Sequence, residues 1–125
     1  MSSAMSDAVA VPVYDHSRSL IFYRDLLGFE LRHDRQSKSE RIIALAPKGS
    51  QRHIELVSPC AGLQPGSTQG LLVPTSDIEG MHQRLASGGV EISPIQEVEH
   101  GRFATFTDPD GNAWALVESY VVMRA

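Results

Sequence analysis

One short segment of the chain combines an acid and an imidazole in a pattern that can do chemistry. Residues 53–57 read HIELV, an apolar stretch of strand type that contains His53 and Glu55. Successive side chains of a β-strand point to opposite faces, so His53 and Glu55 share one face of the predicted strand. If that face lines a cavity, a partly desolvated carboxyl group there suits a general acid or base. We therefore predict Glu55 as the catalytic candidate and His53 as a ligand contact beside it.

Simpler interpretations of these residues remain open. Glu55 can be a carboxylate that only pairs with an arginine, and His53 can be an ordinary surface residue of a strand. A metal site built from His53, Glu55 and His100 is another alternative, although nothing in their spacing requires it. Cys60 is the single cysteine of the sequence, so no disulfide can form within the chain. Its environment is therefore expected to be reducing, and the protein cytoplasmic.

The elements that must position these side chains occur twice along the chain. When Asp15 is set over Asp77, residues 11–12 fall on residues 73–74, and both pairs read VP. The other collinear matches, with gaps confined to turns, are residues 28–31 with 89–92, 47–49 with 109–111, and 54–57 with 114–117. Matches in the same order over separate segments indicate an internal duplication.

Each half of the duplication predicts the same order of elements. A short apolar strand comes first, an aspartate at a helix N-cap follows, and a helical pattern then ends at Gly28 or at the Gly88–Gly89 pair. The strands expected after the helices span residues 29–34, 41–46 and 53–58, and residues 91–96, 103–107 and 113–120. The linker over residues 58–69 is too short to separate independent domains. We therefore predict a single α+β domain over residues 1–125, with βαβββ repeats at 8–58 and 70–120.

The bulk composition excludes several classes of function. The chain has 125 residues, of which 42% are hydrophobic and 21% charged, an ordinary balance for one globular domain. A net charge of −4 argues against a nucleic-acid partner, because phosphates require a basic surface. No apolar stretch is long enough to cross a membrane. The first residues are polar, without the basic and apolar regions of a secretory signal, which again favours the cytoplasm.

Two motifs at opposite ends of the repeat resemble a known family. Residues 22–30 read FYRDLLGFE, and residues 106–114 read FTDPDGNAW. They resemble the first-helix and final-hairpin signatures of the vicinal oxygen chelate superfamily, which includes glyoxalase I, bleomycin-resistance proteins and extradiol dioxygenases. The resemblance extends from about residue 8 to residue 118. It implies paired βαβββ modules whose strands curl into a partly open, barrel-like mixed sheet with the helices outside, and it implies a homodimer.

The resemblance also locates the positions where a metal is bound in many members. Those members place His, Glu or Gln ligands on the first and last strands of each module. The corresponding positions in this chain are Ala8 or Val9, Glu55, Leu71 and Ala115. Only Glu55 can ligate, and one carboxylate holds a divalent metal weakly. We therefore expect no metal cofactor, with weak binding of a divalent metal as the alternative.

Other residues are assigned to the cavity by the same resemblance. Arg102 precedes a strand near the expected cavity mouth, where its fork could recognise a carboxylate or phosphate. Phe106 lies an even number of residues after Arg102, so it shares the same face of the strand and would supply an apolar wall. Leu71, Val73 and Ala115 would form an apolar floor in place of a chelating one.

These residues predict binding of a small molecule as the function, with catalysis as the alternative. An apolar floor without metal ligands predicts a protein that binds a small organic molecule in its cavity. The alternative is a lyase, isomerase or dioxygenase of the glyoxalase kind that uses Glu55 as a base or a metal ligand. A third alternative is a regulatory subunit whose pocket is packed shut.

Overall fold

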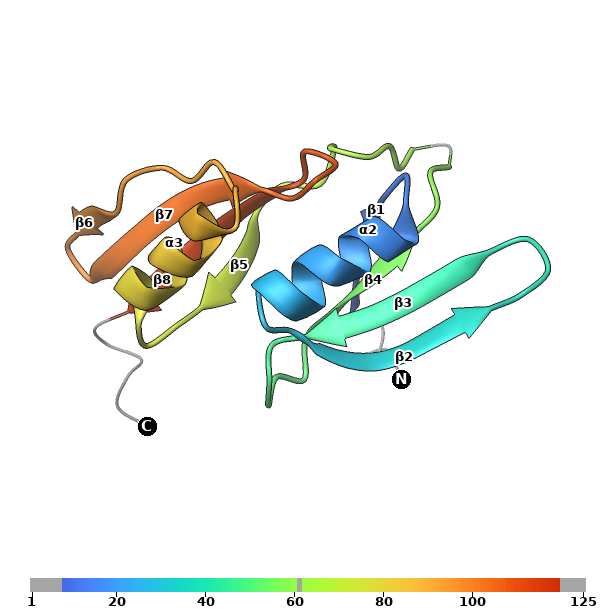
Figure 1. Ribbon diagram of the computed structural model, residues 1–125, viewed down its shortest axis with the longest axis horizontal. Coiled ribbons are helices and arrows are strands. Elements are labelled where there is room, and N and C mark those ends of the chain that lie inside the picture. Colours follow the sequence, from blue (N-terminus) through green and yellow to red (C-terminus); the bar gives the residue numbers. More distant parts are fainter. Residues whose placement is uncertain (1–7, 61, 120–125) are drawn as a thin grey trace. The chain divides into compact units, whose positions relative to one another are not determined.

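The computed structural model describes residues 8–60 and 62–119. The chain divides into two compact units, of which the first holds residues up to Thr68 together with Pro109–Asn112, and the second holds the rest. Each unit is a four-stranded mixed sheet with a helix across one face (Figure 1). Tyr120, the predicted end of the last strand, lies outside the described residues. No helix in the described ranges is long and apolar enough to span a membrane.

The first unit follows the predicted order of elements. Its elements are β1 (Ala8–Pro12), α2 (His16–Leu20), the π-helix η1 (Ile21–Leu26), β2 (Glu30–Gln36), β3 (Arg41–Ala46) and β4 (His53–Val57). The strand order is β1-β4-β3-β2. Strand β1 pairs with β4 in parallel, and the other pairs are antiparallel.

The second unit repeats this arrangement. Its elements are β5 (Leu71–Pro74), α3 (Ile78–Ser87), β6 (Gln96–Val98), β7 (Gly101–Thr107) and β8 (Ala113–Ser119), and the strand order is β5-β8-β7-β6. Val73 lies opposite Leu116 in the parallel pair, as Val11 lies opposite Leu56 in the first unit. The registers of the two sheets therefore agree with the alignment of the two halves of the sequence.

The predicted helix boundaries are confirmed at both ends. Asp15 caps the first helix, because its Oδ1 accepts the backbone N–H groups of Ser17 and Arg18 at 3.0 and 3.2 Å. Asp77 caps α3 through the N–H of Gly80 at 3.0 Å. Gly28 and Gly89 follow the helices with φ values of 79° and 92°, the left-handed conformation expected of a helix C-terminus.

The strand expected over residues 91–96 is wrong in its position. Only Gln96–Val98 forms a strand at this edge, and Ile92 makes an isolated bridge to Phe106. Pro94 has no N–H to give to a ladder, which is consistent with the absence of regular pairing at residues 91–95. The hydroxyl of Ser93 instead accepts the N–H of Thr105 at 2.9 Å, which holds the segment against β7 without a regular ladder.

The cores lie between the helices and the sheet faces that they cover. Strand alternation and register put the fully buried Ile43 and Leu56 on the helix-bearing face of the first sheet, and Leu116 on that of the second. The other face of each sheet carries no helix of its own unit (Figure 1). We call these surfaces the first open face, which includes Ala44 and Glu55, and the second open face, which includes Leu72 and Ala115.

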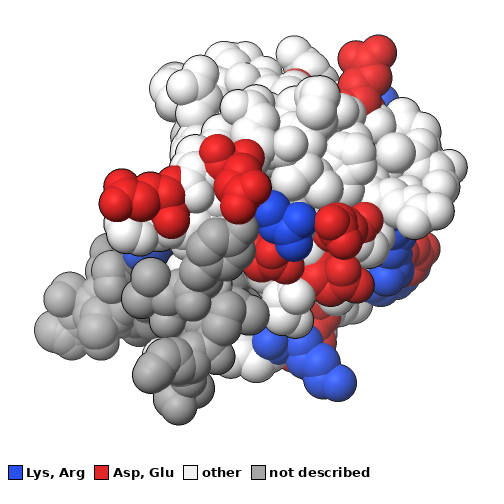
Figure 2. Space-filling view, turned by 90° about the vertical axis from the view of Figure 1, so that its left-hand side faces the viewer, with Lys and Arg blue, Asp and Glu red and all other residues white. Residues whose placement is uncertain are grey.

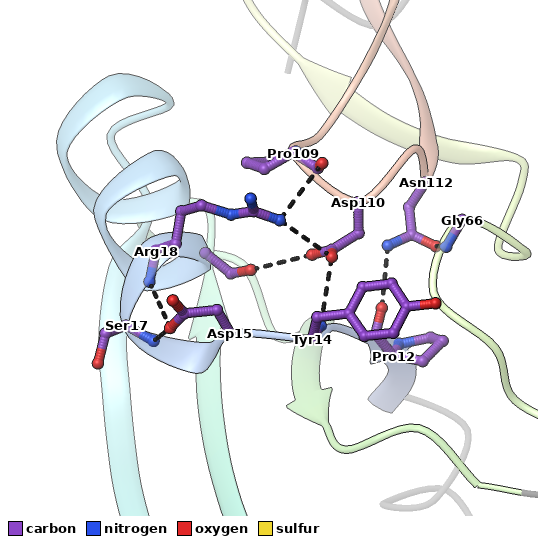
Figure 3. Close-up of polar contacts among 10 residues, drawn as sticks. Pro12, Tyr14, Asp15, Ser17, Arg18, Gly66, Pro109, Asp110 and Asn112 are labelled. Carbon is purple, nitrogen blue, oxygen red and sulfur yellow. Dashed lines mark hydrogen bonds and ion pairs between the residues drawn. The ribbon is translucent and has the colours of Figure 1, made fainter.

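The turn between β7 and β8 packs on the first unit. The Asp110 carboxylate accepts hydrogen bonds from the N–H of Tyr14 and from Arg18 Nη2, both at 3.2 Å (Figure 3). Asn112 accepts the N–H of Gly66 at 3.1 Å and donates to the carbonyl oxygen of Pro12 at 3.2 Å. Gly111 has a φ of 93°, so it supplies the positive φ predicted for this turn. The turn is therefore a packing element as well as a chain reversal.

Candidate functional site

The acid and the imidazole singled out above lie together on the first open face. Nε2 of His53 is 3.5 Å from Oε2 of Glu55, and their side chains are 23% and 33% exposed. The flanking Ile54 and Leu56 are buried on the helix-bearing face. The predicted alternation of strand β4 is therefore present. The pair is close enough for an ion pair when the imidazole is protonated, while the catalytic role of Glu55 stays a prediction.

Glu55 also borders a hollow of about 280 Å³ on the same face. The residues that line it come from β2, the following turn, β3 and β4: His33, Arg35, Gln36, Ser37, Glu40, Ile42 and Glu55. Register explains how β2 and β4 contribute to one hollow, because Ala44 lies opposite both His33 and Glu55. Nδ1 of His33 is buried and has no hydrogen-bond partner within the described residues. Sequence reasoning missed this hollow.

The second open face has a different chemical character. Two hollows of about 640 and 420 Å³ lie on it, and both are bordered by Leu72 and Ala115. Leu72 is 60% exposed, and it lies opposite Ala115 in the pairing of β5 with β8. Phe103 and Val117, another cross-strand pair, border the smaller hollow. The centre of this face is therefore an apolar floor, and Ala115 lies in it.

The positions predicted for Leu71 and Val73 need correction. Both side chains are buried, at 7% and 4% exposure, and they lie opposite Trp114 and Leu116 on the helix-bearing face. Leu71 still borders the larger hollow, but the side chain of strand β5 on the open face is Leu72. A shift of one residue moves a side chain to the other face of a sheet, and a four-residue apolar strand gives no alternation that fixes its phase.

The guanidinium group of Arg102, predicted to recognise a ligand, is already paired with carboxylates of the chain. Its Nε and Nη2 donate to Oε1 of Glu118 at 3.0 and 2.6 Å, and its Nη1 donates to Glu79 at 3.0 Å. The pKa of Arg102 is raised above its ordinary value, chiefly by the hydrogen bond to Glu118. Glu118 also accepts the N–H of Ile78, the first residue of α3. Arg102 therefore ties β7 and β8 to the start of α3, on the helix-bearing face.

Phe106 is also on the helix-bearing face. It is 4% exposed and stacks on Trp114, with ring centroids 6.4 Å apart and planes at 9°. Both rings also border the larger hollow. The aromatic residue on the open face is Phe103, which sequence reasoning missed. Strand alternation could have identified it. Val117 is two residues after Ala115 and so shares its face, and Phe103 lies opposite Val117 in the β7–β8 hairpin, as Thr105 lies opposite Ala115.

The open faces do not offer the ligands of a multidentate metal site. Ala115 and Leu72 have no donor atoms, and in the first unit Ala10 lies opposite Glu55 in the sheet. Among the residues that the structure describes, no group of three His, Cys, Asp or Glu side chains is close enough to hold a metal ion. His100 is 72% exposed on the second unit. The donor set therefore does not fit the metal of the resembling family.

Comparison with known proteins gives consistent matches. The family model described as Glyoxalase/Bleomycin resistance protein/Dioxygenase superfamily matches residues 6–116. YetH of Bacillus subtilis, an uncharacterized protein, is 30% identical over 115 residues, which cover 88% of this chain and 94% of YetH.

Solved structures match over most of the chain as well. TnmS3, an antibiotic binding protein from Streptomyces sp. CB03234, is 34% identical with a TM-score of 0.85, covering 90% of this chain and 93% of that one. A protein from Sphaerobacter thermophilus DSM 20745, described as a member of the same superfamily, is 31% identical with a TM-score of 0.82. The match covers 90% of this chain and 94% of the Sphaerobacter chain.

Proposed function

The chain belongs to the Glyoxalase/Bleomycin resistance protein/Dioxygenase superfamily, and from that premise we propose that it binds a small organic molecule on its second open face. The observation that carries the proposal is the hollow of about 640 Å³ over Leu72 and Ala115. Glu91 is the only residue with an ionisable side chain among those that line it. Ligand sites for drug-sized molecules have volumes of about 300–1,000 Å³ and are mostly apolar.

Polar groups at the edge of the hollow supply orientation. Ser93, Thr105 and Thr107 border it together with Gln69 and Glu91. A few hydroxyl and amide groups around an apolar floor favour a molecule with a flat apolar body and polar substituents at its edge. TnmS3, described as an antibiotic binding protein and similar to this chain over 90% of this chain's length, supports a small organic ligand.

A pair of glutamate substitutions tests the proposal. Ala115→Glu introduces a charge in the centre of the floor, while Ala86→Glu introduces the same charge on the exposed side of α3. Trp114, the single tryptophan of the chain, borders the hollow and reports on its contents by fluorescence. Titration with a panel of planar aromatic antibiotics is expected to quench Trp114 saturably. We expect Ala115→Glu to weaken this binding by about tenfold or more, since a buried charge is costly, and Ala86→Glu to leave it unchanged.

Two results would contradict the proposal. One is the absence of saturable quenching by every compound of the panel. The other is equal affinity of the Ala115→Glu and Ala86→Glu variants for a compound that does bind.

The catalytic alternative rests on the pair of Glu55 and His53. A half-buried carboxylate with an imidazole nitrogen at 3.5 Å can accept a proton from a carbon next to a carbonyl group. Backbone N–H groups would then have to stabilise the developing oxyanion, because Arg102 is held by two carboxylates. Glu55→Gln tests this alternative on any substrate found. Unchanged turnover would remove Glu55 from the reaction.

We further propose a cytoplasmic homodimer that does not bind nucleic acid. On the face drawn in Figure 2, Lys and Arg side chains lie among Asp and Glu side chains and form no basic patch. Light scattering of the purified protein tests the dimer, and fractionation of cells tests the location. Retention of the protein on a heparin column at moderate salt would contradict the absence of a nucleic-acid partner.

A further inference from the structure

The hollow on the first open face differs in chemistry from the apolar floor of the second. It has a volume of about 280 Å³, and ionisable side chains from β2, the following turn and β4 line it. We propose that it is a polar subsite for a neutral hydroxylated ring, such as one sugar residue. This inference goes beyond the organic-ligand site proposed above, because it concerns a different face and a different class of ligand.

The shape of the hollow suits a ring with an apolar face. Ile42 borders it from β3, and the small side chain of Ala44 separates His33 from Glu55 in the register of the sheet. A sugar ring has C–H groups on its face and hydroxyl groups at its edge, so Ile42 can contact the face while the polar groups meet the edge.

The hydrogen-bonding groups are complementary to hydroxyl groups. The Glu55 carboxylate only accepts, the Arg35 guanidinium only donates, and a hydroxyl group does both. Arg35 is exposed and makes no ion pair with any described residue. His33 borders the hollow as well, although its Nδ1 is a buried atom without a hydrogen-bond partner within the described part of the chain. A hydroxyl group bound in the hollow can therefore donate to Glu55 and accept from Arg35.

The charges of the hollow select against ions. Glu40 and Glu55 are both acidic, and Arg35 is the one basic residue with a permanent charge among the lining residues. An anionic ligand would meet two carboxylates, and a cationic ligand would meet the guanidinium. A neutral molecule with several hydroxyl groups meets every one of these side chains without such repulsion.

Titration followed by amide NMR tests the proposal on the full chain. The probes are methyl glucoside, methyl mannoside and methyl rhamnoside, with sodium acetate and sodium phosphate as the ionic arm. We expect saturable shifts for amides around His33, Ala44 and Glu55 with at least one glycoside, at an affinity of order millimolar, since one small ring makes few contacts. The anions are expected to cause no saturable shift there.

Matched variants assign the binding to named side chains. Arg35→Ala and Glu55→Gln each remove a charged hydrogen-bonding partner and are expected to weaken glycoside binding by about tenfold or more. Arg52→Ala and Glu30→Gln change the same residue types at exposed positions outside the hollow, and are expected to bind as the unchanged protein does. Thermal melting of each variant verifies that it is folded.

The outcomes separate this inference from the proposed function. Glycoside shifts that persist in Ala115→Glu, which destroys the apolar floor, would support two independent subsites. No saturable shift with any glycoside would overturn the inference, and so would anion binding at the hollow or glycoside binding that Arg35→Ala and Glu55→Gln leave unchanged. None of these results bears on the quenching of Trp114 by aromatic antibiotics.

Discussion

At the scale of single residues, Asp110 makes the clearest contribution to stability. Its side chain is fully buried and accepts hydrogen bonds from the N–H of Tyr14, Arg18 Nη2 and the hydroxyl of Ser19. Asp110→Ala removes the acceptor of all three donors, of which Ser19 is buried, and we expect it to lower the free energy of unfolding by about 2 kcal/mol. Asp25→Ala, at an exposed ion pair between neighbours in sequence, is the control and should leave the midpoint of urea unfolding unchanged. Equal effects of the two substitutions would contradict the assignment.

Glu118 predicts a dependence of stability on pH. The hydrogen bond from Arg102, and next that from the N–H of Ile78, hold the pKa of this carboxyl below its ordinary value of 4.5. A lowered pKa means that the unfolded chain binds the proton more tightly, so stability falls as the medium is acidified. The contribution of Glu118 is therefore complete above pH 4.5 and is lost as the pH falls through its lower folded-state pKa.

The measurement is urea unfolding between neutral pH and pH 3. Glu118→Gln is expected to flatten the loss of stability at the acidic end, because glutamine does not titrate. Glu99→Gln, at a side chain that is 87% exposed, serves as the control and should retain the acidic loss. A Glu118→Gln variant with the same acidic loss as the unchanged protein would rule out this role.

The residues of the site could be predicted from the sequence where an alternating pattern was long enough. Five residues of alternating character put His53 and Glu55 on one face correctly. Arg102 was wrongly assigned to the cavity, because the carboxylates that it binds are distant in sequence. The predicted turn around Asp110 does set a hairpin in which Arg102 lies opposite one of them, Glu118. The hollow beside Glu55 depends on the register of three strands, which no local pattern specifies.

At the scale of elements, Gly66 allows the β7–β8 turn to approach the linker. Its φ is 87°, and a Cβ atom there would lie 2.7 Å from the carbonyl oxygen of Asp110. Gly62 has a similar φ of 83° but open space around the same position. Gly62→Ala is therefore expected to cost only the conformational strain of about 1–2 kcal/mol, and Gly66→Ala about 1 kcal/mol or more beyond that because backbone atoms must shift. Comparing the two unfolding free energies checks this, and equal losses would show that the contact is relieved without cost.

The elements themselves were largely predictable because their signals are local. Asp15 and Asp77 mark helix starts, and Gly28 and Gly89 mark helix ends, each through its own backbone or side-chain chemistry. The strand near Pro94 was misplaced because the prediction followed the apolar residues of the segment and ignored that proline has no backbone N–H for strand pairing. The π-helical form of Ile21–Leu26 was not predicted, since the apolar spacing of this segment does not distinguish one helical form from another.

At the scale of the whole molecule, the expected absence of a metal cofactor predicts that chelators have no effect on the protein. Of the four positions that the family resemblance assigns to metal ligands, only Glu55 has a side chain that can ligate. We expect dialysis against a chelator to leave both the melting temperature and the affinity for an aromatic antibiotic unchanged. Elemental analysis before dialysis completes the measurement. One tightly bound divalent metal per chain, with loss of binding on its removal, would contradict the expectation.

The duplication was visible in the sequence because both halves kept the same structural signals. The two sheets share strand order and register, yet Glu55 and His53 on one open face correspond to Ala115 and Ala113 on the other. The registers of the repeats therefore agree, while their open faces differ at these two positions. The fold could be inferred from the retained positions, and the divergent positions carry the information on ligands.

The Pro109–Asn112 turn connects the sequence of the second repeat to the packing of the first unit. The turn is part of the second repeat in sequence, yet it belongs to the first unit in packing, where Asp110 and Asn112 accept N–H groups from Tyr14, Gly66 and Thr68. A gene fragment ending at the linker would lack these acceptors. The first unit is therefore completed by a segment that the second repeat supplies. If the chain is cut in the linker, its two fragments should reassemble with one another more readily than either assembles with its own copy.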